Sequence, residues 1–157
     1  MYNVAPYLRE CLDSVQNQSY ENFLAIMIND GSTDESAQIA QEYLSDPRFV
    51  LINQENQGLA LVRNAGLEYL KQLEGQNNTP DNNNLVGFVD SDDVISKNYF
   101  CNLVFSMQAH NVKIAKCSDV AIFDTNHYNA KTFRIRQRQT KGLAWQFKHN
   151  KITKAEV

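Results

Sequence analysis

The sequence predicts an α/β fold in which helices flank a mostly parallel sheet, and two observations support it. Apolar segments of strand length alternate with segments of helical periodicity over the first two thirds of the chain. These apolar segments are nearly unbroken, which is typical of strands buried on both faces of a sheet. Such alternation implies right-handed crossovers between parallel strands. Ligands of sheets of this kind bind at the carboxyl ends of the strands.

The first helix and the first strand are predicted from their apolar patterns. Residues 6–18 carry apolar side chains at steps of three and four, and Pro6 suits a first helical turn. The apolar positions are Tyr7, Leu8, Cys11, Leu12 and Val15. The segment "NFLAIMIND", residues 22–30, is predicted to be a buried strand.

A second helix, a second strand and a third helix follow. The segment "STDE", Ser32 to Glu35, fits a capping box before a helix face of four residues. That face comprises Ala37, Ala40, Tyr43 and Leu44. "RFVLIN" indicates a strand, and residues 58–73 indicate a helix with one apolar side. That side comprises Leu59, Val62, Leu70 and Leu73.

The segments after residue 73 are predicted to form a loop, a strand, a helix and two further strands. The Asn-rich stretch 74–84 is predicted to be a loop, and "LVGFV", residues 85–89, a strand. Ser96 is expected to cap a helix bearing Phe100, Leu103, Val104 and Met107. Beyond residue 111, "VKIAKCSDVAIFDT" and "TFRIRQRQ" resemble strands.

Composition places the chain among ordinary globular proteins. It has 157 residues, of which 43% are hydrophobic and 21% charged, so we expect one globular domain. The three cysteines, Cys11, Cys101 and Cys117, lack metal-ligand spacing, and we interpret them as small buried hydrophobes in a reducing compartment. No apolar segment of membrane-spanning length and no secretory-signal layout is visible, so a cytoplasmic location is expected.

Charge is distributed unevenly along the chain. The net charge is −3, yet residues 131–157 carry eight Lys or Arg and one acid. This basic tail, with Trp145 and Phe147, indicates either a peripheral contact with an anionic membrane or a solvated basic face. We expect no nucleic-acid partner. His110, His127 and His149 are scattered and form no metal-binding pattern.

Two acidic turns follow predicted strands. In "NDGSTD", Asp30 ends a strand and Gly31 permits a sharp turn before a helix N-terminus, a combination that suits nucleotide binding. In "DSDD", Asp90 and Asp92 are oxygen ligands that Mg²⁺ or Mn²⁺ would accept together with substrate phosphates. Either motif alone is more often a plain turn or helix cap. Their shared position after parallel strands favours a common crevice.

The residues "YNVAPYLRECLDSVQNQSYENFLAIMINDGSTDES", "INQENQGLALVRNAG" and "FVDSDD" resemble, in order and spacing, the nucleotide-binding half of family 2 glycosyltransferases. The resemblance covers residues 2–100 and implies the Rossmann-like GT-A fold. It also implies a nucleotide-sugar donor, typically a UDP-sugar, a divalent cation (Mn²⁺ or Mg²⁺), and a glycan or lipid-linked acceptor of the kind used in surface polysaccharide or lipopolysaccharide synthesis.

The resemblance also implies roles for five residues. Tyr2 would lie against the base, Asp30 would hydrogen-bond it, and Arg63 would lie near the diphosphate. Asp90 would face the ribose or sugar, and Asp92 would bind the metal. No catalytic residue is assigned, because no later carboxylate belongs to a motif of the family.

Two departures from the family pattern lead to further expectations. The family's first strand, which precedes the Tyr-Asn pair, is absent, and the sequence after residue 111 matches no motif, so a chain truncated at both ends is expected. Residues 1–111 are predicted to be the nucleotide-sugar-binding part and residues 112–157 the start of an acceptor-side region. The alternatives are an inactive nucleotide-binding remnant and a haloacid-dehalogenase-like phosphatase.

Overall fold

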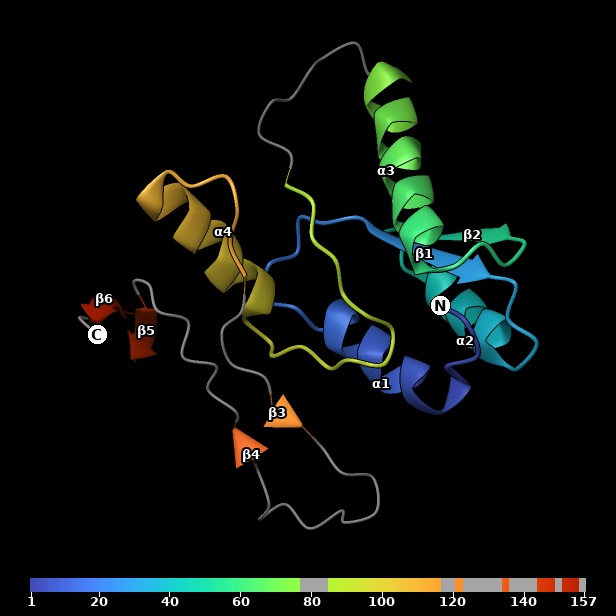
Figure 1. The fold of residues 1–157 in the computed structure, drawn as a ribbon, viewed down its shortest axis with the longest axis horizontal. Helices are drawn as coiled ribbons and strands as arrows, with labels where there is room; N and C mark the ends of the chain where they lie inside the picture. Colours follow the sequence, from blue (N-terminus) through green and yellow to red (C-terminus); the bar gives the residue numbers. More distant parts are fainter. Residues whose placement is uncertain (77–84, 117–120, 123–133, 136–143, 149–150, 156–157) are drawn as a thin grey trace. The chain divides into compact units, whose positions relative to one another are not determined.

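The computed structural model describes residues 1–76, 85–116, 121–122, 134–135, 144–148 and 151–155. The chain forms two units, Met1–Val112 and Lys113–Val157, which are considered separately below. The first unit contains a parallel sheet of two strands, β1 (Ala25–Asp30) and β2 (Phe49–Gln54), with helices around it (Figure 1). This arrangement confirms the predicted α/β fold class with a small parallel sheet.

Helix α1 (Ala5–Gln16) supplies much of the core of the first unit. Its apolar positions recur at three- and four-residue steps and form a buried stripe consisting of Leu8, Cys11, Leu12 and Val15. Pro6 lies in the first turn, where a missing N–H leaves no hydrogen bond unmade. The prediction for this helix is confirmed, except that Tyr7 is 47% exposed and lies outside the buried stripe.

The two strands have their faces covered by different helices. Met27 packs in a cluster with residues of α1, of α2 (Ser36–Glu42) and of the adjoining 3₁₀ turn η1 (Tyr43–Ser45). On the other face, Ile28 approaches α3 (Leu59–Gln76) at Gly66, where an added Cβ would lie 3.2 Å from the Ile28 side chain. Burial of both faces explains why β1 has an almost unbroken apolar sequence.

The start of α2 differs from the prediction. Glu35, not Ser32, occupies the N-cap position, and it makes no side-chain cap hydrogen bond. The Ser32 hydroxyl instead accepts a hydrogen bond from the Asn3 amide, at 3.2 Å. The capping-box prediction is therefore wrong, because a contact 29 residues away in sequence uses this hydroxyl. The apolar face predicted for this helix is also not fully buried, since the Leu44 side chain is 44% exposed.

Segment 85–89 was predicted to be a strand, and the structure shows it without strand pairing. Figure 1 draws it as a plain trace and not as an arrow. A turn follows it, in which the Asp93 amide donates to the Asp90 carbonyl at 3.0 Å. A strand requires a neighbour to accept and donate its backbone hydrogen bonds. Among the described residues, segment 85–89 has no such neighbour, so its apolar sequence alone does not produce a strand.

Helix α4 (Tyr99–His110) follows this segment and corresponds to the last predicted helix. Its N-cap is Asn98 rather than the predicted Ser96, whose carbonyl accepts a hydrogen bond from the Tyr99 amide. Cys101 on this helix is exposed, which contradicts its interpretation as a buried hydrophobe, whereas Cys11 is buried as expected. Cys117 lies outside the described residues.

Among the described residues of the second unit, four short strands form antiparallel pairs. Strand β3 (Ala121–Ile122) pairs with β4 (Arg134–Ile135), and β5 (Ala144–Lys148) pairs with β6 (Lys151–Ala155). The β3–β4 pair lies within the two stretches predicted to be strands, while most of those stretches falls outside the described residues. In the part of the chain that the structure describes, no helix is both long enough and apolar enough to cross a membrane.

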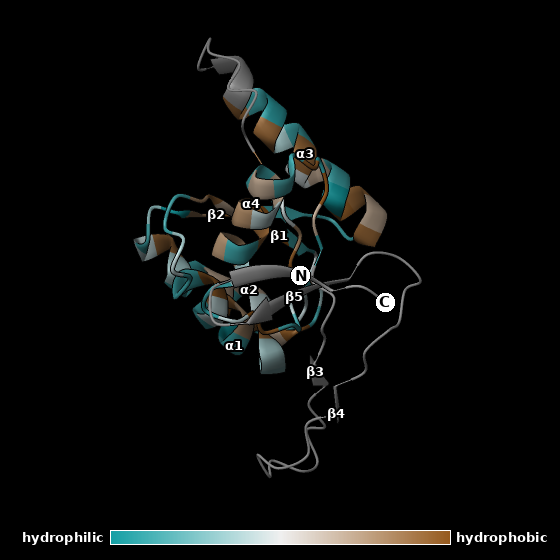
Figure 2. Ribbon diagram, turned by 90° about the vertical axis from the view of Figure 1, so that its left-hand side faces the viewer, coloured by the Kyte–Doolittle hydropathy of each residue, from teal (hydrophilic) through white to brown (hydrophobic). Residues whose placement is uncertain are grey.

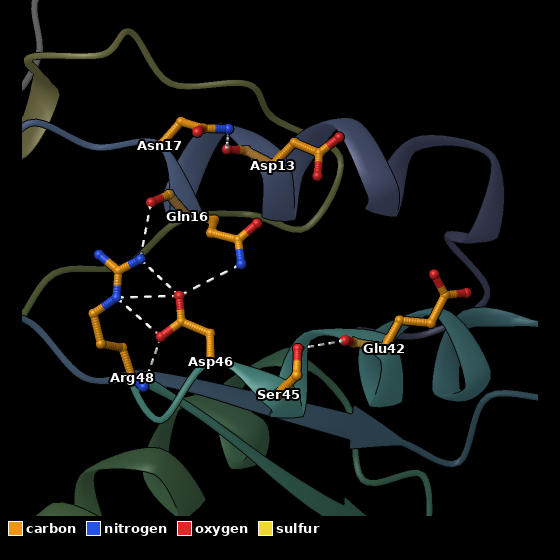
Figure 3. A network of polar contacts seen from close by, with 7 residues as sticks. All are labelled: Asp13, Gln16, Asn17, Glu42, Ser45, Asp46 and Arg48. Carbon is orange, nitrogen blue, oxygen red and sulfur yellow. Dashed lines mark hydrogen bonds and ion pairs between the residues drawn. The ribbon is translucent and has the colours of Figure 1, made fainter.

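Hydrogen bonds around the ion pair of Arg48 with Asp46 join the end of α1 to the segment before β2. The Arg48 guanidinium donates to the Asp46 carboxylate at 2.7 Å and to the Gln16 carbonyl at 3.1 Å (Figure 3). The Phe23 ring lies 4.6 Å from the Arg48 guanidinium carbon, a cation–π contact. These contacts satisfy a carbonyl at the helix end and fix the direction in which β2 enters the sheet.

The folded state is expected to lose stability as the pH falls below about 4. Hydrogen bonds donated by Arg48 lower the pKa of Asp46, and hydrogen bonds from Ser36 lower the pKa of Asp34, both from an ordinary value of 3.8. A carboxylate with a lowered pKa stabilises the fold above its unfolded pKa, and this contribution is lost as the pH falls through the folded pKa. Urea unfolding between pH 7 and pH 3 measures the effect.

The variant Asp46→Asn serves as the control, because an amide does not titrate in this range. Its stability should fall less steeply with decreasing pH than that of the parent chain. Identical pH profiles for the two proteins would contradict the assignment.

Candidate functional site

Asp30 ends β1 and holds the loop that leads into α3. One carboxylate oxygen, Oδ1, accepts hydrogen bonds from the Gln54 side chain at 2.7 Å and from the Gln57 amide at 2.9 Å. The other, Oδ2, accepts one from the Gly58 amide at 2.9 Å. Asp30 and Gln54 are partners in the strand register, which explains why their side chains meet. Oδ2 therefore keeps one acceptor position beyond these three hydrogen bonds.

Asp30 is kept charged although it is only 3% exposed. Burial by itself raises the pKa of a carboxyl group, but the hydrogen bonds from Gln57, Gln54 and Gly58 outweigh it and lower the pKa of Asp30 from its ordinary value. The structure thus maintains a negative charge at the carboxyl end of β1, beside the N-terminus of α3. A helix N-terminus stabilises such a charge.

The turn after Asp30 requires glycine. Gly31 has φ +70°, and a Cβ at this position would lie 2.9 Å from the Asn56 amide nitrogen. Gly58 has φ +84°, but an added Cβ there would meet no atom within 4 Å. The two glycines therefore differ in crowding while sharing a left-handed backbone. The close approach brings the loop after β1 against the loop after β2.

We expect Gly31→Ala to destabilise the fold more than Gly58→Ala. Both variants incur the left-handed strain of about 1–2 kcal/mol, and Gly31→Ala adds about 1–3 kcal/mol for the clash with the backbone of Asn56. Chemical denaturation of both variants measures the difference. Equal losses would mean that the loop at Asn56 moves without cost.

Asp90 is joined to Arg63 of α3. The guanidinium donates to the Asp90 carboxylate at 2.8 Å, and both side chains are exposed, at 42% for Arg63 and 55% for Asp90. The Phe88 ring lies 5.4 Å from the Arg63 guanidinium carbon. An exposed ion pair of this kind contributes only about 0–1 kcal/mol, so another anion can displace Asp90 from Arg63 at little cost.

Both acidic turns therefore contact the first turns of α3. Asp30 accepts a hydrogen bond from Gly58, next to the first residue of the helix, and Asp90 pairs with Arg63. Five residues of helix rise by about 7–8 Å, so the two turns are held at the same end of one helix. The arrangement combines a buried anion, an exposed cation and a cluster of carboxylates beside a helix N-terminus.

The carboxylates of the second turn influence one another. Burial raises the pKa of Asp93, and the negative charges of Asp92 and Asp90 raise it further. Proximity of like charges is unfavourable unless a cation is bound, and carboxylate oxygens suit Mg²⁺ and Mn²⁺. In the described ranges no three or more His, Cys, Asp or Glu side chains form a metal-binding group. A cation at this turn would need further ligands, which water and substrate phosphates can supply, and its binding stays a prediction.

Tyr2 is the remaining residue predicted to belong to the site. Its side chain is 51% exposed, and the neighbouring Asn3 has φ +52°. The Asn3 side chain accepts hydrogen bonds from the amide and hydroxyl of Thr33, at 2.8 Å and 3.3 Å. These contacts tie the Tyr2–Asn3 turn to the loop that follows Gly31. The role of Tyr2 against a base stays a prediction.

The structure adds residues that sequence reasoning missed. Gln54 and Gln57 hold Asp30, and Asn53 pairs with Asn29 through side-chain amides at 2.9 Å. The parallel register could have revealed them, because it places Asn53 opposite Asn29 and Gln54 opposite Asp30. Phe88 beneath Arg63 had no detectable signal, since the prediction of a strand gave no reason to pair it with a helix residue.

These features define an α/β domain with one acidic turn at the carboxyl end of β1 and a second after segment 85–89, both in contact with the first turns of α3. The family model described as glycosyl transferase family 2 matches residues 1–155, and the chain belongs to this family. The resemblance found in the sequence is thereby confirmed, and the phosphatase alternative is not favoured.

Three relatives illustrate the similarity. The chain is 42% identical over 116 residues to the glycosyltransferase GlyA of Streptococcus pneumoniae, covering 73% of this chain and 15% of GlyA. It is 36% identical over 118 residues to EpsJ of Bacillus subtilis, an uncharacterized glycosyltransferase. This match covers 74% of this chain and 31% of EpsJ. It is 33% identical over 118 residues to the minor teichoic acid biosynthesis protein GgaB of Bacillus subtilis. This match covers 73% of this chain and 12% of GgaB. The chain thus spans less than a third of the length of these relatives.

Proposed function

We propose that this chain is the nucleotide-sugar-binding part of a glycosyltransferase of hexosyltransferase type. The donor is a UDP-sugar, and the acceptor is a glycan or a lipid-linked glycan. Family membership over residues 1–155 supports glycosyl transfer as the activity. The single structural observation that carries the proposal is the attachment of both Asp30 and Asp90 to the first turns of α3.

Each residue has a distinct part in this proposal. The exposed ring of Tyr2 stacks on the base, and the free acceptor position of Asp30 receives a hydrogen bond from it. Arg63 exchanges Asp90 for the diphosphate, since their exposed ion pair is weak and a guanidinium binds phosphate oxygens in bidentate fashion. Asp90, once released, faces the ribose or the sugar.

Asp92, with Asp93 beside it, would hold a divalent cation, Mn²⁺ or Mg²⁺. When bound, such a cation supplies Lewis-acid stabilisation of the negative charge that develops on the departing diphosphate. Burial chiefly raises the pKa of Asp93, and the charges of Asp92 and Asp90 add to this effect, so a bound cation would relieve only the second contribution. The chain's own contribution is to keep these carboxylates beside Arg63 at the N-terminal end of α3.

The acceptor class is proposed from the similarity to one relative. GgaB is named for the biosynthesis of minor teichoic acid, and a surface glycan acceptor is proposed for this chain by analogy with it. We further propose a cytoplasmic location with peripheral membrane contact through the basic residues of 131–157, an expectation from composition.

A thermal-shift panel tests the donor and the cation together. The chain is melted with UDP, ADP, GDP or CDP, each with and without Mn²⁺. We expect the largest stabilisation with UDP plus Mn²⁺, because a ligand stabilises only the state that it binds; a concentration of about 100 times Kd contributes about 2.7 kcal/mol. Absence of any nucleotide-dependent shift would contradict the proposal. Binding without donor hydrolysis or transfer would identify an inactive remnant.

A further inference from the structure

Strands β1 and β2 end in polar residues that are partners in the sheet register. Both strands are apolar over their first four residues, and each ends in two polar residues, Asn29 and Asp30 in β1 and Asn53 and Gln54 in β2 (Figure 2). Asn29 lies opposite Asn53, and Asp30 lies opposite Gln54. Successive residues of a strand point to opposite faces of a sheet, so these two polar pairs lie on different faces.

The two polar pairs hold different groups. The Asn29 side chain donates to the Asn53 side chain at 2.9 Å and accepts from the Ser32 amide at 3.1 Å, so it supports the loop after β1. The Gln54 side chain instead donates to Asp30 Oδ1 at 2.7 Å. The other donors to Asp30 are backbone amides, which any residue except proline carries. Gln54 is therefore the contact of Asp30 that depends on the side chain at its position.

The three hydrogen bonds occupy the two oxygens of Asp30 unequally. A carboxylate has about four lone-pair positions, two on each oxygen. Oδ1 uses both of its positions, for the Gln54 side chain and the Gln57 amide. Oδ2 uses one position, for the Gly58 amide. A ligand that reaches Asp30 therefore meets one vacant acceptor position, on Oδ2, and must supply a hydrogen-bond donor to it.

Gln54 also helps to keep Asp30 ionised. Burial raises the pKa of Asp30, but its three hydrogen bonds outweigh this effect and lower the pKa below the ordinary value. Neutral groups face Asp30 from β2 and from the start of α3, and a charged group, the Met1 amine, lowers the pKa further. Without the Gln54 donor, Oδ1 would have a vacant position at which a proton can bind. A protonated Asp30 can donate as well as accept, so the ligand would no longer have to supply a donor.

We propose that Gln54 is a positioning residue for the choice of nucleobase: its amide occupies Asp30 Oδ1, so that only Oδ2 remains to accept and the site selects a base that presents an N–H. This inference rests on the nucleotide-sugar donor proposed above. Uracil carries an N–H at N3, whereas cytosine carries an acceptor there. A site built to bind a donor rejects an analogue that lacks it. Gln54 acts through Asp30 and does not itself contact the base.

Titration of Asp30 in the absence of nucleotide is the first test. The carboxyl carbons of aspartate are labelled with ¹³C and followed by NMR in the parent chain, in Gln54→Met and in Gln54→Lys. Methionine has a similar length but cannot donate, so Asp30 should take up its proton at a higher pH than in the parent chain. The lysine amine can donate and is positively charged, so Asp30 should titrate at a lower pH. An unchanged titration of Asp30 in either variant would overturn the proposal.

The relative affinity for UDP and CDP is the second readout. Isothermal titration in the presence of Mn²⁺ measures both nucleotides at pH 5.5 and at pH 8. The ratio of UDP to CDP affinity should fall by about tenfold in Gln54→Met, the effect of one hydrogen bond. The fall should be larger at pH 5.5, where a carboxyl group with a raised pKa is protonated more often. Gln54→Lys should keep the preference for UDP, and its loss in both variants would contradict the proposal.

Gln72→Met is the matched control, because it is the same substitution at an exposed residue of α3. It should change neither the Asp30 titration nor the preference for UDP. The two readouts also separate this inference from the proposed function. If the parent chain binds neither nucleotide, the proposed function fails, and the titration still decides whether Gln54 keeps Asp30 ionised. If Gln54→Met retains the full preference for UDP, the proposed function stands and the role of Gln54 is wrong.

Discussion

Leu8→Ala is expected to destabilise the first unit by about 2–5 kcal/mol. Leu8 is 0% exposed and belongs to the cluster in which α1 meets Met27, Ile39 and Phe49. Its truncation removes apolar contacts and leaves a cavity, since neighbouring elements relax only in part. Because small domains are stable by about 5–15 kcal/mol, the loss is a large fraction of the total.

Urea unfolding, followed by circular dichroism, measures this loss. Leu44→Ala is the matched control, because Leu44 is 44% exposed and lies outside the cluster. Its effect should stay within about 0.5 kcal/mol. A comparable loss in both variants would show that α1 does not form the centre of the core.

Asp92→Asn is expected to abolish the Mn²⁺-dependent part of nucleotide binding. The substitution keeps the shape of the side chain and removes the charge, so the affinity for the cation should fall by at least the roughly 10–100-fold that loss of an outer-shell partner already costs. The thermal stabilisation by UDP plus Mn²⁺ should then shrink to the shift given by UDP alone. Isothermal titration with Mn²⁺ in the presence of UDP provides a second readout.

The control for Asp92→Asn is Glu68→Gln, which removes an exposed carboxylate of α3 that forms an ion pair with Lys71, at 3.2 Å. This variant should retain the full Mn²⁺-dependent shift. If Asp92→Asn behaved in the same way, the cation would be bound elsewhere or not required, and the assignment of Asp92 would be wrong.

Sequence periodicity predicted the elements that contribute to the core of the first unit. Helix α1 and strands β1 and β2 were found because their apolar residues lie in patterns that follow from the geometry of a helix face or a doubly covered strand. The strand predicted at 85–89 failed because pairing depends on a neighbour, which local sequence does not report. The cap predicted at Ser32 failed because Asn3, distant in sequence, engages the hydroxyl.

Part of the candidate site was also predictable, because the order of elements indicates which residues follow a strand. The order of elements placed Asp30 correctly at the end of a strand, whereas Asp90 follows a segment that forms no strand; both residues nevertheless contact the start of α3. Their immediate partners were not predictable, because the three hydrogen bonds to Asp30 depend on the path of the loop after β2. The pairing of Arg63 with Asp90 depends on the turn of a segment that lacks regular structure.

The rate at which the buried Cys11 thiol is modified can measure local opening of the acidic turn. The Cys11 sulfur is covered by the Asp90 carbonyl, while Cys101 is exposed on α4. A maleimide reagent should therefore modify Cys101 at once and reach Cys11 only when the acidic turn lifts away. In a Cys101→Ser background, with Cys117 also replaced, the labelling half-time would report how often that turn opens, and any ligand that clamps it would lengthen the half-time.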